Sequence, residues 1–270
     1  MRGTSRASLE VVQARFEPVL VAAGVAAATL GEELFALVDA LDASGPLRRT
    51  LADPSLDEDA KAGLVATIMP TADPRTVAVV TDMVRARWSA DADLAEAAEV
   101  LAFHAVLASA QAAGELEAVE VELFRLAQAL KGEREVRRGL YNPLVTAEQR
   151  VALVDGSLHG QGTAATQLIA RRAAAAPRGR RYLVTLAHIG DLVAERRSRQ
   201  VATVTSATEL SGAQSARLLQ ILAQAYGQAI QLNVIVDEQV LGGLRIQVGP
   251  DVVDSTTLSR IADARRQLAS

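Results

Sequence analysis

Apolar residues recur along most of the chain at alternating spacings of three and four, which places them on one face of an α-helix. One such stripe comprises Leu30, Leu34, Leu37 and Leu41. A second stripe comprises Val119, Leu123, Leu126 and Leu130. Each stripe needs an apolar neighbour to be buried, so the pattern predicts amphipathic helices packed into bundles.

The segment 91–114 carries apolar residues on two sides of one predicted helix. The first side holds Leu94, Ala98, Leu101, Ala105 and Ala108. The second side holds Val100, Phe103 and Leu107. Because a helix that is apolar on two sides needs two neighbours, we expect this helix to close one bundle and to open the next.

The helical part of the chain looks duplicated. The stretch LADPSLDEDAKAGL (51–64) is similar to LYNPLVTAEQRVAL (140–153), with leucines, a proline and a basic residue in step. Pro54 and Pro143 are 89 positions apart, and the same offset relates the two leucine-rich stripes and Leu94 to Leu183. The sequence therefore predicts two copies of one helical unit that align without an insertion. Helix starts are predicted at Asp57 and at Thr146, where Gln149 completes a capping box.

After residue 199 the apolar period changes to that of β-strands. Strands are predicted at 201–207, 232–236 and 244–248, with helices at 211–226 and 257–268. Ser211 and Gln214 form another capping box. The predicted fold is α+β and mostly α, a duplicated helical bundle followed by a small α/β domain of order β-α-β-β-α. The predicted domains are residues 1–104, 105–199 and 200–270.

Composition narrows the possible functions. Hydrophobic residues make up 50% and charged residues 22% of the chain, which is typical of a soluble globular protein. Aromatic residues are only 3%, which favours close helix packing over a cavity for a flat ligand. The chain has no cysteine, so disulfides, zinc-thiolate sites and thiol nucleophiles are excluded.

Charge is distributed unevenly. Residues 1–110 carry 9 basic and 16 acidic side chains, a balance of −7, whereas residues 111–199 carry 14 and 10, a balance of +4. The last 71 residues carry 5 and 6, a balance of −1. The two helical copies therefore face different electrostatic partners, or each other.

The most apolar stretch is Val19–Leu30, which is shorter than the roughly 20 residues that cross a bilayer. A signal peptide is one interpretation, because Arg2, Arg6 and Arg15 precede it. The acidic residues Glu10 and Glu17 and the adjacent Pro18 favour a buried helix.

The carboxy-terminal stretch VTSATELSGAQSARLLQILAQAYGQAIQLNVIVDEQVLGGLRIQVGPDVVDSTTLSRIADARRQL (204–268) resembles the delta subunit family of F-type ATP synthases, which includes the mitochondrial oligomycin-sensitivity-conferring protein. NPLVTAEQRVALV (142–154) resembles the amino-terminal six-helix bundle of that family. Residues from about 100 to 270 match a member of ordinary length, and the extra copy in front resembles the long actinobacterial form.

This resemblance implies a structural signature in the last domain, namely Leu241, Gly242, Gly243, Gly249 and Asp254. Paired glycines allow backbone angles that a Cβ would forbid, so the chain can turn between two strands there. The family usually has a Val-Asp-Pro turn where this chain has Val236, Asp237 and Glu238, so the geometry of that turn stays open.

The same resemblance implies that the chain would be a non-catalytic peripheral-stalk subunit on the cytoplasmic side of the cell membrane. Its helical bundle would bind the amino-terminal segments of the α subunits, and its last domain would bind the b subunit. No catalytic residue, cofactor, metal, nucleic acid or direct membrane insertion is expected.

Three alternatives depend on local motifs. The basic stretch Arg171–Tyr182 would suit a helical-repeat adaptor that binds nucleic acid through residues 171–181. The loop Gly160–Ala165 matches a loose dinucleotide motif, although a helix rather than a strand precedes it. A metal site would need His104, His159 and His188, which lie far apart in the sequence.

Overall fold

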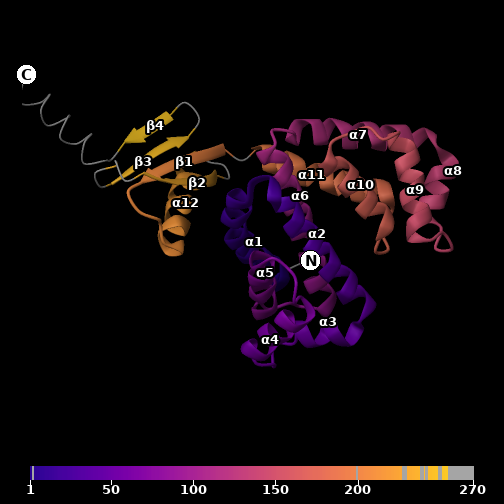
Figure 1. The fold of residues 1–270 in the computed structure, drawn as a ribbon, viewed down its shortest axis with the longest axis horizontal. Coiled ribbons are helices and arrows are strands. Elements are labelled where there is room, and N and C mark those ends of the chain that lie inside the picture. The colour runs from indigo at the N-terminus through magenta and orange to yellow at the C-terminus, as the bar shows by residue number, and fades with distance from the viewer. Residues whose placement is uncertain are drawn as a thin grey trace, which may run out of the picture. The chain divides into compact units, whose positions relative to one another are not determined.

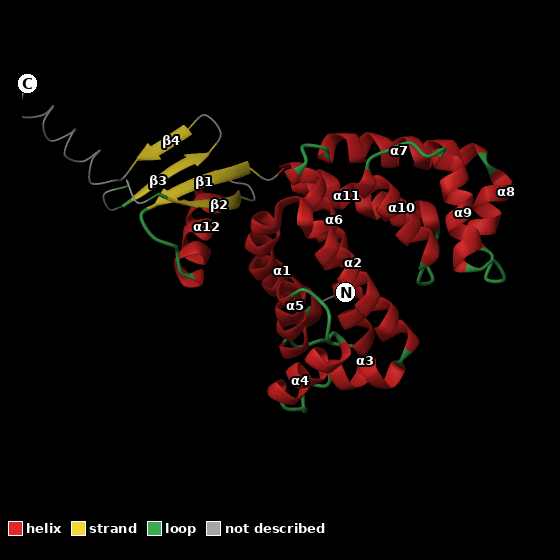
Figure 2. Cartoon of the chain, viewed as in Figure 1, coloured by secondary structure: helices red, strands yellow, loops and turns green. Residues whose placement is uncertain are grey.

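The computed structural model of the protein describes residues 1, 3–198, 200–226, 230–237, 240, 243–248 and 251–254. The chain forms two compact units, Met1–Ala194 and Glu195–Ser270. Figure 2 shows that, among the described residues, the first unit is built from helices and the strands belong to the second. This arrangement confirms the predicted mostly α, α+β fold.

The first unit begins with helices that precede the predicted join. They are α1 (Thr4–Ala23), the 3₁₀ helix η1 (Gly24–Ala26), α2 (Ala27–Ala43), α3 (Gly45–Ala52), α4 (Glu58–Ile68) and α5 (Pro74–Arg85). The join and the helices after it are α6 (Asp91–Ala112), α7 (Leu116–Gly132), α8 (Arg134–Tyr141), α9 (Ala147–Leu158), α10 (Ala164–Ala175) and α11 (Tyr182–Ser198). Figure 1 shows α2 to α5 gathered on one side of α6 and α7 to α10 on the other.

The duplication is visible in the helix bounds. Adding 89 to both bounds of α2 gives those of α7, and adding 89 to both bounds of α3 gives those of α8. Both leucine-rich stripes are buried, as their spacing predicts. The predicted capping box of Thr146 and Gln149 opens α9, and Asp57 caps α4.

The prediction that the copies align without an insertion is wrong beyond α9. Asp73 caps α5 and Thr163 caps α10, which is an offset of 90. The burial of α11 fits an offset of 91, because the buried Leu192 then corresponds to the buried Leu101. The original offset of 89 would instead pair the buried Ala95 with Val184, which is 56% exposed. One extra residue at the end of α9 and another before α11 account for these shifts.

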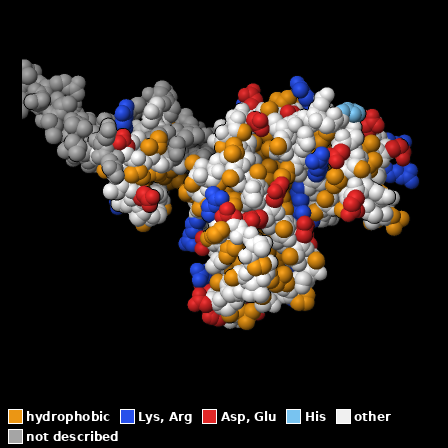
Figure 3. Space-filling view, in the orientation of Figure 1, with side chains coloured by type: hydrophobic (Ala, Val, Ile, Leu, Met, Phe, Trp, Pro, Cys, Tyr) orange, Lys and Arg blue, Asp and Glu red, His pale blue; other side chains and the backbone are white. Residues whose placement is uncertain are grey.

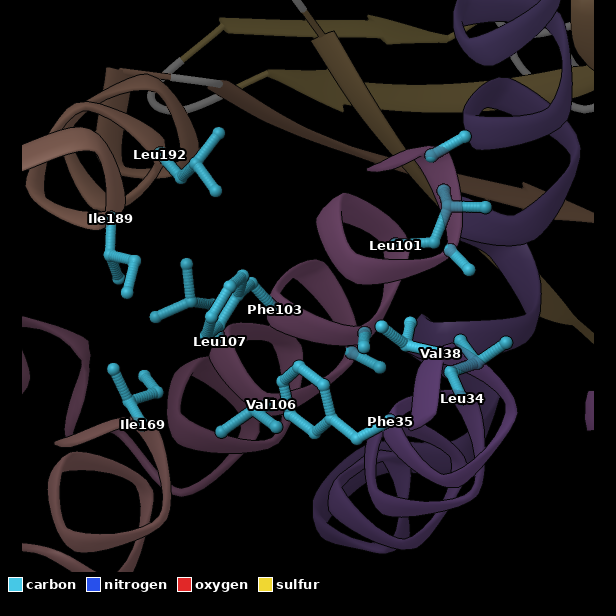
Figure 4. Packing of buried hydrophobic residues seen from close by; sticks show 14 of the residues in the cluster. Leu34, Phe35, Val38, Leu101, Phe103, Val106, Leu107, Ile169, Ile189 and Leu192 are labelled. Atoms are coloured by element: carbon cyan, nitrogen blue, oxygen red, sulfur yellow. The ribbon is translucent and has the colours of Figure 1, made fainter. Parts of the chain in front are cut away.

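Helix α6 is buried on both predicted sides. Figure 4 shows Leu34, Phe35 and Val38 of α2 on one side of it, and Ile169, Ile189 and Leu192 of α10 and α11 on the other. Leu101 is fully buried near α2, and Phe103 and Leu107 are buried toward α10 and α11. The prediction that this helix closes one bundle and opens the next is therefore confirmed, and the two bundles share one hydrophobic core. The domain bounds at residues 104 and 199 stay a prediction.

Helices α2 and α6 approach closely at Gly31. A Cβ at this glycine would lie 2.9 Å from the backbone oxygen of Ala102 and 2.9 Å from Cγ2 of Val106. We expect Gly31→Ala to destabilise the helical unit by about 1 to 3 kcal/mol, because overpacking forces the two helices apart.

Gly63, in α4, provides the matched control. A Cβ there would meet nothing within 4 Å, so Gly63→Ala should stabilise the protein by about 0.5 to 1 kcal/mol through helix propensity. Urea unfolding of both variants measures the two effects. Equal changes in the two variants would contradict the close approach of α2 and α6.

The helical segment Thr4–Ala43 is long and apolar enough to cross a membrane by length and composition alone, with a mean hydropathy of 1.6 over its best window. Core helices pass the same test. Here η1 interrupts the segment, and Leu20, Leu30 and Leu34 are buried in the hydrophobic core of the helical unit. This location fits the buried-helix interpretation of Val19–Leu30.

The second unit contains a four-stranded mixed sheet. Its described elements are β1 (Gln200–Ser206), α12 (Gly212–Tyr226), β2 (Ile230–Val236), β3 (Leu244–Val248) and β4 (Asp251–Asp254). The strand order is β2-β1-β3-β4, in which β1 pairs parallel to β2 and antiparallel to β3. Helix α12 starts at the predicted capping box of Ser211 and Gln214. Among the described residues, α12 and the sheet form a hydrophobic core of Ala202, Val204, Leu222, Ile230, Leu232 and Val248.

The strands at 201–207, 232–236 and 244–248 are confirmed to within a few residues, but β4 was not predicted. It pairs antiparallel to β3, with Asp254 opposite Arg245. Gly243 has φ of +84°, a left-handed conformation that suits glycine at the predicted turn. Leu241, Gly242 and Gly249 of the signature and the predicted helix at 257–268 lie outside the described residues.

Candidate functional site

The two bundles are joined by ion pairs between oppositely charged side chains. Their acidic members are Asp39 and Asp42 on α2 and Glu99 on α6; their basic members are Arg172 on α10 and Arg178 and Arg180 in the loop before α11. We call these six residues the ionic seam. In Figure 3, blue and red side chains adjoin in the middle of the helical unit. The charge asymmetry of the sequence is thus partly neutralised within the molecule.

Glu99 is the buried centre of the ionic seam. Its side chain is 3% exposed and pairs with Arg178 at 3.2 Å and with Arg180. Arg178 also pairs with Asp42 at 2.8 Å and donates to the carbonyl of Ala95. Arg178 has φ of +50°, which is costly for a residue with a Cβ and persists where surrounding contacts determine the conformation.

The ionic seam changes the interpretation of the basic stretch at 171–181. Besides the three arginines of the seam, Arg171 pairs with Asp155 at 2.7 Å and Arg181 lies over the ring of Tyr141. Every arginine of this stretch therefore has a partner within the chain. Phosphate binding would have to compete with these contacts, so the structure favours the protein-facing interpretation over a nucleic-acid site.

The loop at 160–165 does not form a phosphate cradle. Gly160 and Gly162 have positive φ, as a loop between two helices requires, and Thr163 caps α10. Glu122 of α7 accepts hydrogen bonds from the amide (2.9 Å) and the hydroxyl (3.0 Å) of Thr163. A carboxylate already occupies this helix start, where a phosphate would bind.

The environment of Glu122 favours its ionised form. Burial raises the pKa of this carboxyl, but hydrogen bonds from Thr166 and Thr163 oppose burial and leave the pKa below its usual value. The equivalent Glu33 of α2 accepts from the amide of Asp73 at 2.9 Å. Glu33 thus helps to cap the start of α5, and Glu122 helps to cap the start of α10.

The three histidines do not come together. His104 is buried on α6 beside Gln13, His159 ends α9 in a left-handed conformation, and His188 lies exposed on α11. Over the residues that the structure describes, no group of three or more His, Cys, Asp or Glu side chains could hold a metal ion.

Two phenylalanines at equivalent positions of the helical copies differ in burial. Phe35 of α2 is 5% exposed, whereas Phe124, at the same position of α7, is 62% exposed. The ring of Phe35 packs edge-on against Phe103 of α6, with centroids 5.0 Å apart, and the guanidinium of Arg172 lies 4.7 Å above it. The face of α2 that carries Phe35 is thus buried against α6 and α10, whereas the matching face of α7, which carries Phe124, is exposed.

The first copy carries an apolar groove. It lies between α1 and α5 and has a volume of about 270 Å³. Phe16 and Val19 of α1 and Ala78 and Val79 of α5 form its floor and walls. Such a groove suits a few side chains of a partner helix, since small-molecule pockets span about 300 to 1,000 Å³.

Comparisons with known proteins point to one family. The family model for the ATP synthase delta (OSCP) subunit matches residues 104–268. The chain is 49% identical over its whole length to the ATP synthase subunit delta of Beutenbergia cavernae and 42% identical to that of Thermobifida fusca, covering 100% of both relatives. It is also 39% identical to that of Streptomyces coelicolor, with 99% of that relative covered.

A double helical bundle followed by a small α/β unit defines a mostly α protein of the α+β class. The chain belongs to the ATP synthase delta (OSCP) subunit family, in the long form of its actinobacterial relatives. It is therefore a non-catalytic subunit of the F-type ATP synthase, a membrane-associated complex. The family model begins inside α6, whereas the full-length relatives also span the first helical copy.

Proposed function

We propose that the chain completes the peripheral stalk of the ATP synthase and links the α/β head to the b subunit. In this proposal the helical unit binds the amino-terminal segments of α subunits, and the carboxy-terminal unit binds the end of b. The subunit lies peripherally at the cytoplasmic side of the cell membrane, without inserting into it. It holds the head against rotor torque, so that proton flow drives ATP synthesis.

The observation that carries this proposal is the construction of the chain from two compact units with separate hydrophobic cores. Two units allow one chain to bind two different partners. The helical unit also has a feature that suits a mechanical load, because the ionic seam ties α2 to α10 and to the loop before α11. Charge pairs with defined geometry at an interface fix its register.

Cross-linking of the intact synthase, followed by mass spectrometry, tests the proposal. Cross-links from the helical unit to α and from the carboxy-terminal unit to b are the expected result. Cross-links from both units to a single partner would contradict the proposed link.

The carboxy-terminal unit offers apolar side chains to a partner. Ile221 on α12 is 53% exposed, and Ile235 and Val236 at the end of β2 are 46% and 47% exposed. Of the described residues of this unit, six form the core given above. A domain of about 70 residues has limited stability of its own, because a chain this short can bury only a small core. Binding of the b subunit should therefore stabilise this unit.

We expect a peptide from the carboxy-terminal end of b to stabilise the carboxy-terminal unit by about 2.7 kcal/mol at a hundredfold excess over its Kd. For a unit of this size, that stabilisation raises the melting temperature by about 10 °C or more. Differential scanning calorimetry of the full chain measures the shift, and a scrambled peptide serves as the control. An unchanged transition at saturating peptide would contradict b binding by this unit.

A further inference from the structure

Helix α7 carries an exposed stripe on the side opposite its buried leucines. Its five members follow the alternating spacing of four and three that keeps residues on one narrow face of a helix. They are Glu117, Val121, Phe124, Gln128 and Lys131, and all five are exposed. We call these five residues the α7 stripe. Figure 1 shows α7 along one edge of the helical unit, so the stripe is open to a partner on this unit.

Phe124 is the apolar centre of the α7 stripe. The chain has four phenylalanines, and the other three are 2% to 5% exposed, whereas Phe124 is 62% exposed. Val121, about one turn earlier, is 39% exposed. Burial of these two side chains against a partner would remove apolar surface from water, which favours association.

The equivalent stripe of α2 makes contacts between helices of the chain. Phe35 packs edge-on against a phenylalanine of α6, and Asp39 and Asp42 pair with arginines of the ionic seam. At the offset of 89, Gln128 and Lys131 of α7 replace these two aspartates. The aromatic ring is kept in α7 but the acidic charge is lost, so this face no longer suits an arginine-rich partner.

The charges of the α7 stripe are arranged symmetrically about Phe124. Glu117 lies seven residues before this phenylalanine, in the first turn of the helix, and Lys131 lies seven residues after it, in the last turn. If a second α7 lies antiparallel with the two phenylalanines in contact, each Glu117 faces the Lys131 of the other helix. The stripe is therefore complementary to itself, as an interface between two copies related by a two-fold axis requires.

We propose that two copies of the free chain associate through the α7 stripe, as an antiparallel pair of α7 helices with Phe124 against Phe124 at its centre. This association goes beyond the proposed function, because it needs neither the α subunit nor the b subunit. A single helix pair buries less surface than the roughly 800 Å² per partner of a standard interface, so the dimer is weak. We expect a Kd on the order of 100 µM.

The positions of Glu117 and Lys131 also suit the dipole of α7 itself, which favours an acid at the start of a helix and a base at its end. The dipole and the interface respond differently when the two charges are exchanged. Exchange within each helix opposes the dipole but keeps an attractive pair between two antiparallel helices. A charge-exchange variant therefore tests the interface separately from the stability of the helix.

Sedimentation equilibrium of the full-length chain between about 10 µM and 1 mM measures the association, and the average mass should rise from monomer toward dimer. Phe124→Asp places a charge at the centre of the contact and should raise the Kd at least about tenfold. Val184→Asp on α11 is the matched control, because this valine is 56% exposed and lies outside the stripe. It should change the Kd less than about twofold. Circular dichroism checks that both variants keep the fold.

The charges of the stripe are tested by exchange. Glu117→Lys and Lys131→Glu should each raise the Kd about fivefold, because each substitution creates two like-charge pairs in the dimer. The double variant that combines both substitutions should return the Kd to within about twofold of the native value.

Three results would overturn the inference. A native chain that stays monomeric at about 1 mM would exclude the dimer. A dimer whose Kd is unchanged by Phe124→Asp would have its contact on another surface. A double variant that dimerises no better than the single charge variants would contradict the antiparallel pairing of the two helices.

Discussion

Replacement of Phe35 by alanine is expected to destabilise the helical unit by about 3 to 5 kcal/mol. The ring is 5% exposed and contacts both Phe103 and Arg172. Its removal leaves a cavity between the two bundles and uncovers Arg172, whose side chain is only 11% exposed. Few single substitutions at other helical positions combine these two costs.

Phe124 is the matched control, because it occupies the same position of the repeat on α7. Its ring is 62% exposed, so Phe124→Ala should change stability by no more than about 0.5 kcal/mol. Urea unfolding followed by circular dichroism measures both variants. Similar losses in the two variants would show that α2 does not pack against the second copy as described.

The second large effect is expected at the ionic seam. Glu99→Ala should cost about 3 kcal/mol, because it leaves Arg178 and Arg180 without their shared carboxylate. The expected cost is at the lower end of the range for buried pairs, since the Arg180 side chain is 30% exposed and can be hydrated.

Asp59 provides a control acid in an exposed salt bridge. It pairs with Arg85 at 3.1 Å, but its side chain is 89% exposed, so Asp59→Ala should cost less than about 1 kcal/mol. A double-mutant cycle of Glu99→Ala with Arg178→Ala measures the coupling energy directly. A coupling energy near zero would contradict the role of Glu99 as the centre of the seam.

The helices were predictable because their signals are local. A stripe such as Leu30 to Leu41 and a cap such as Thr146 with Gln149 depend on residues within a few turns of one another. The two apolar sides of α6 are local patterns of the same kind, so the sequence alone predicts two neighbours for this helix. The short strand β4 was missed because two valines between two aspartates give too few alternating residues to distinguish a strand from a loop.

The contacts that join the two copies were not predictable. The uneven charge of the sequence indicated that the copies could face each other. The partners in the seam are nevertheless far apart in the sequence, since Arg172 and Asp39 are 133 positions apart. The added residues lie near the end of α9 and before α11, where no local pattern marks an insertion, so the shifted register could not be predicted. Only the helix caps of the structure show that Arg172, rather than Arg171, corresponds to Asp82.

The groove between α1 and α5 also depends on contacts between residues that are far apart in the sequence. Phe16 and Val79 belong to ordinary amphipathic helices, and their spacing predicts burial in a core rather than a groove. The sequence also cannot show that α2 is buried at Phe35 while α7 is exposed at Phe124, since the two residues have the same place in the same stripe.

The most direct test of the proposed link between head and stalk is proton-driven ATP synthesis in membrane vesicles that are depleted of this subunit. ATP hydrolysis by the head is assayed in parallel. A non-catalytic link between head and stalk predicts that synthesis is lost, that hydrolysis persists, and that added purified chain restores synthesis. Synthesis at the undepleted rate in the absence of the chain would contradict the proposed function.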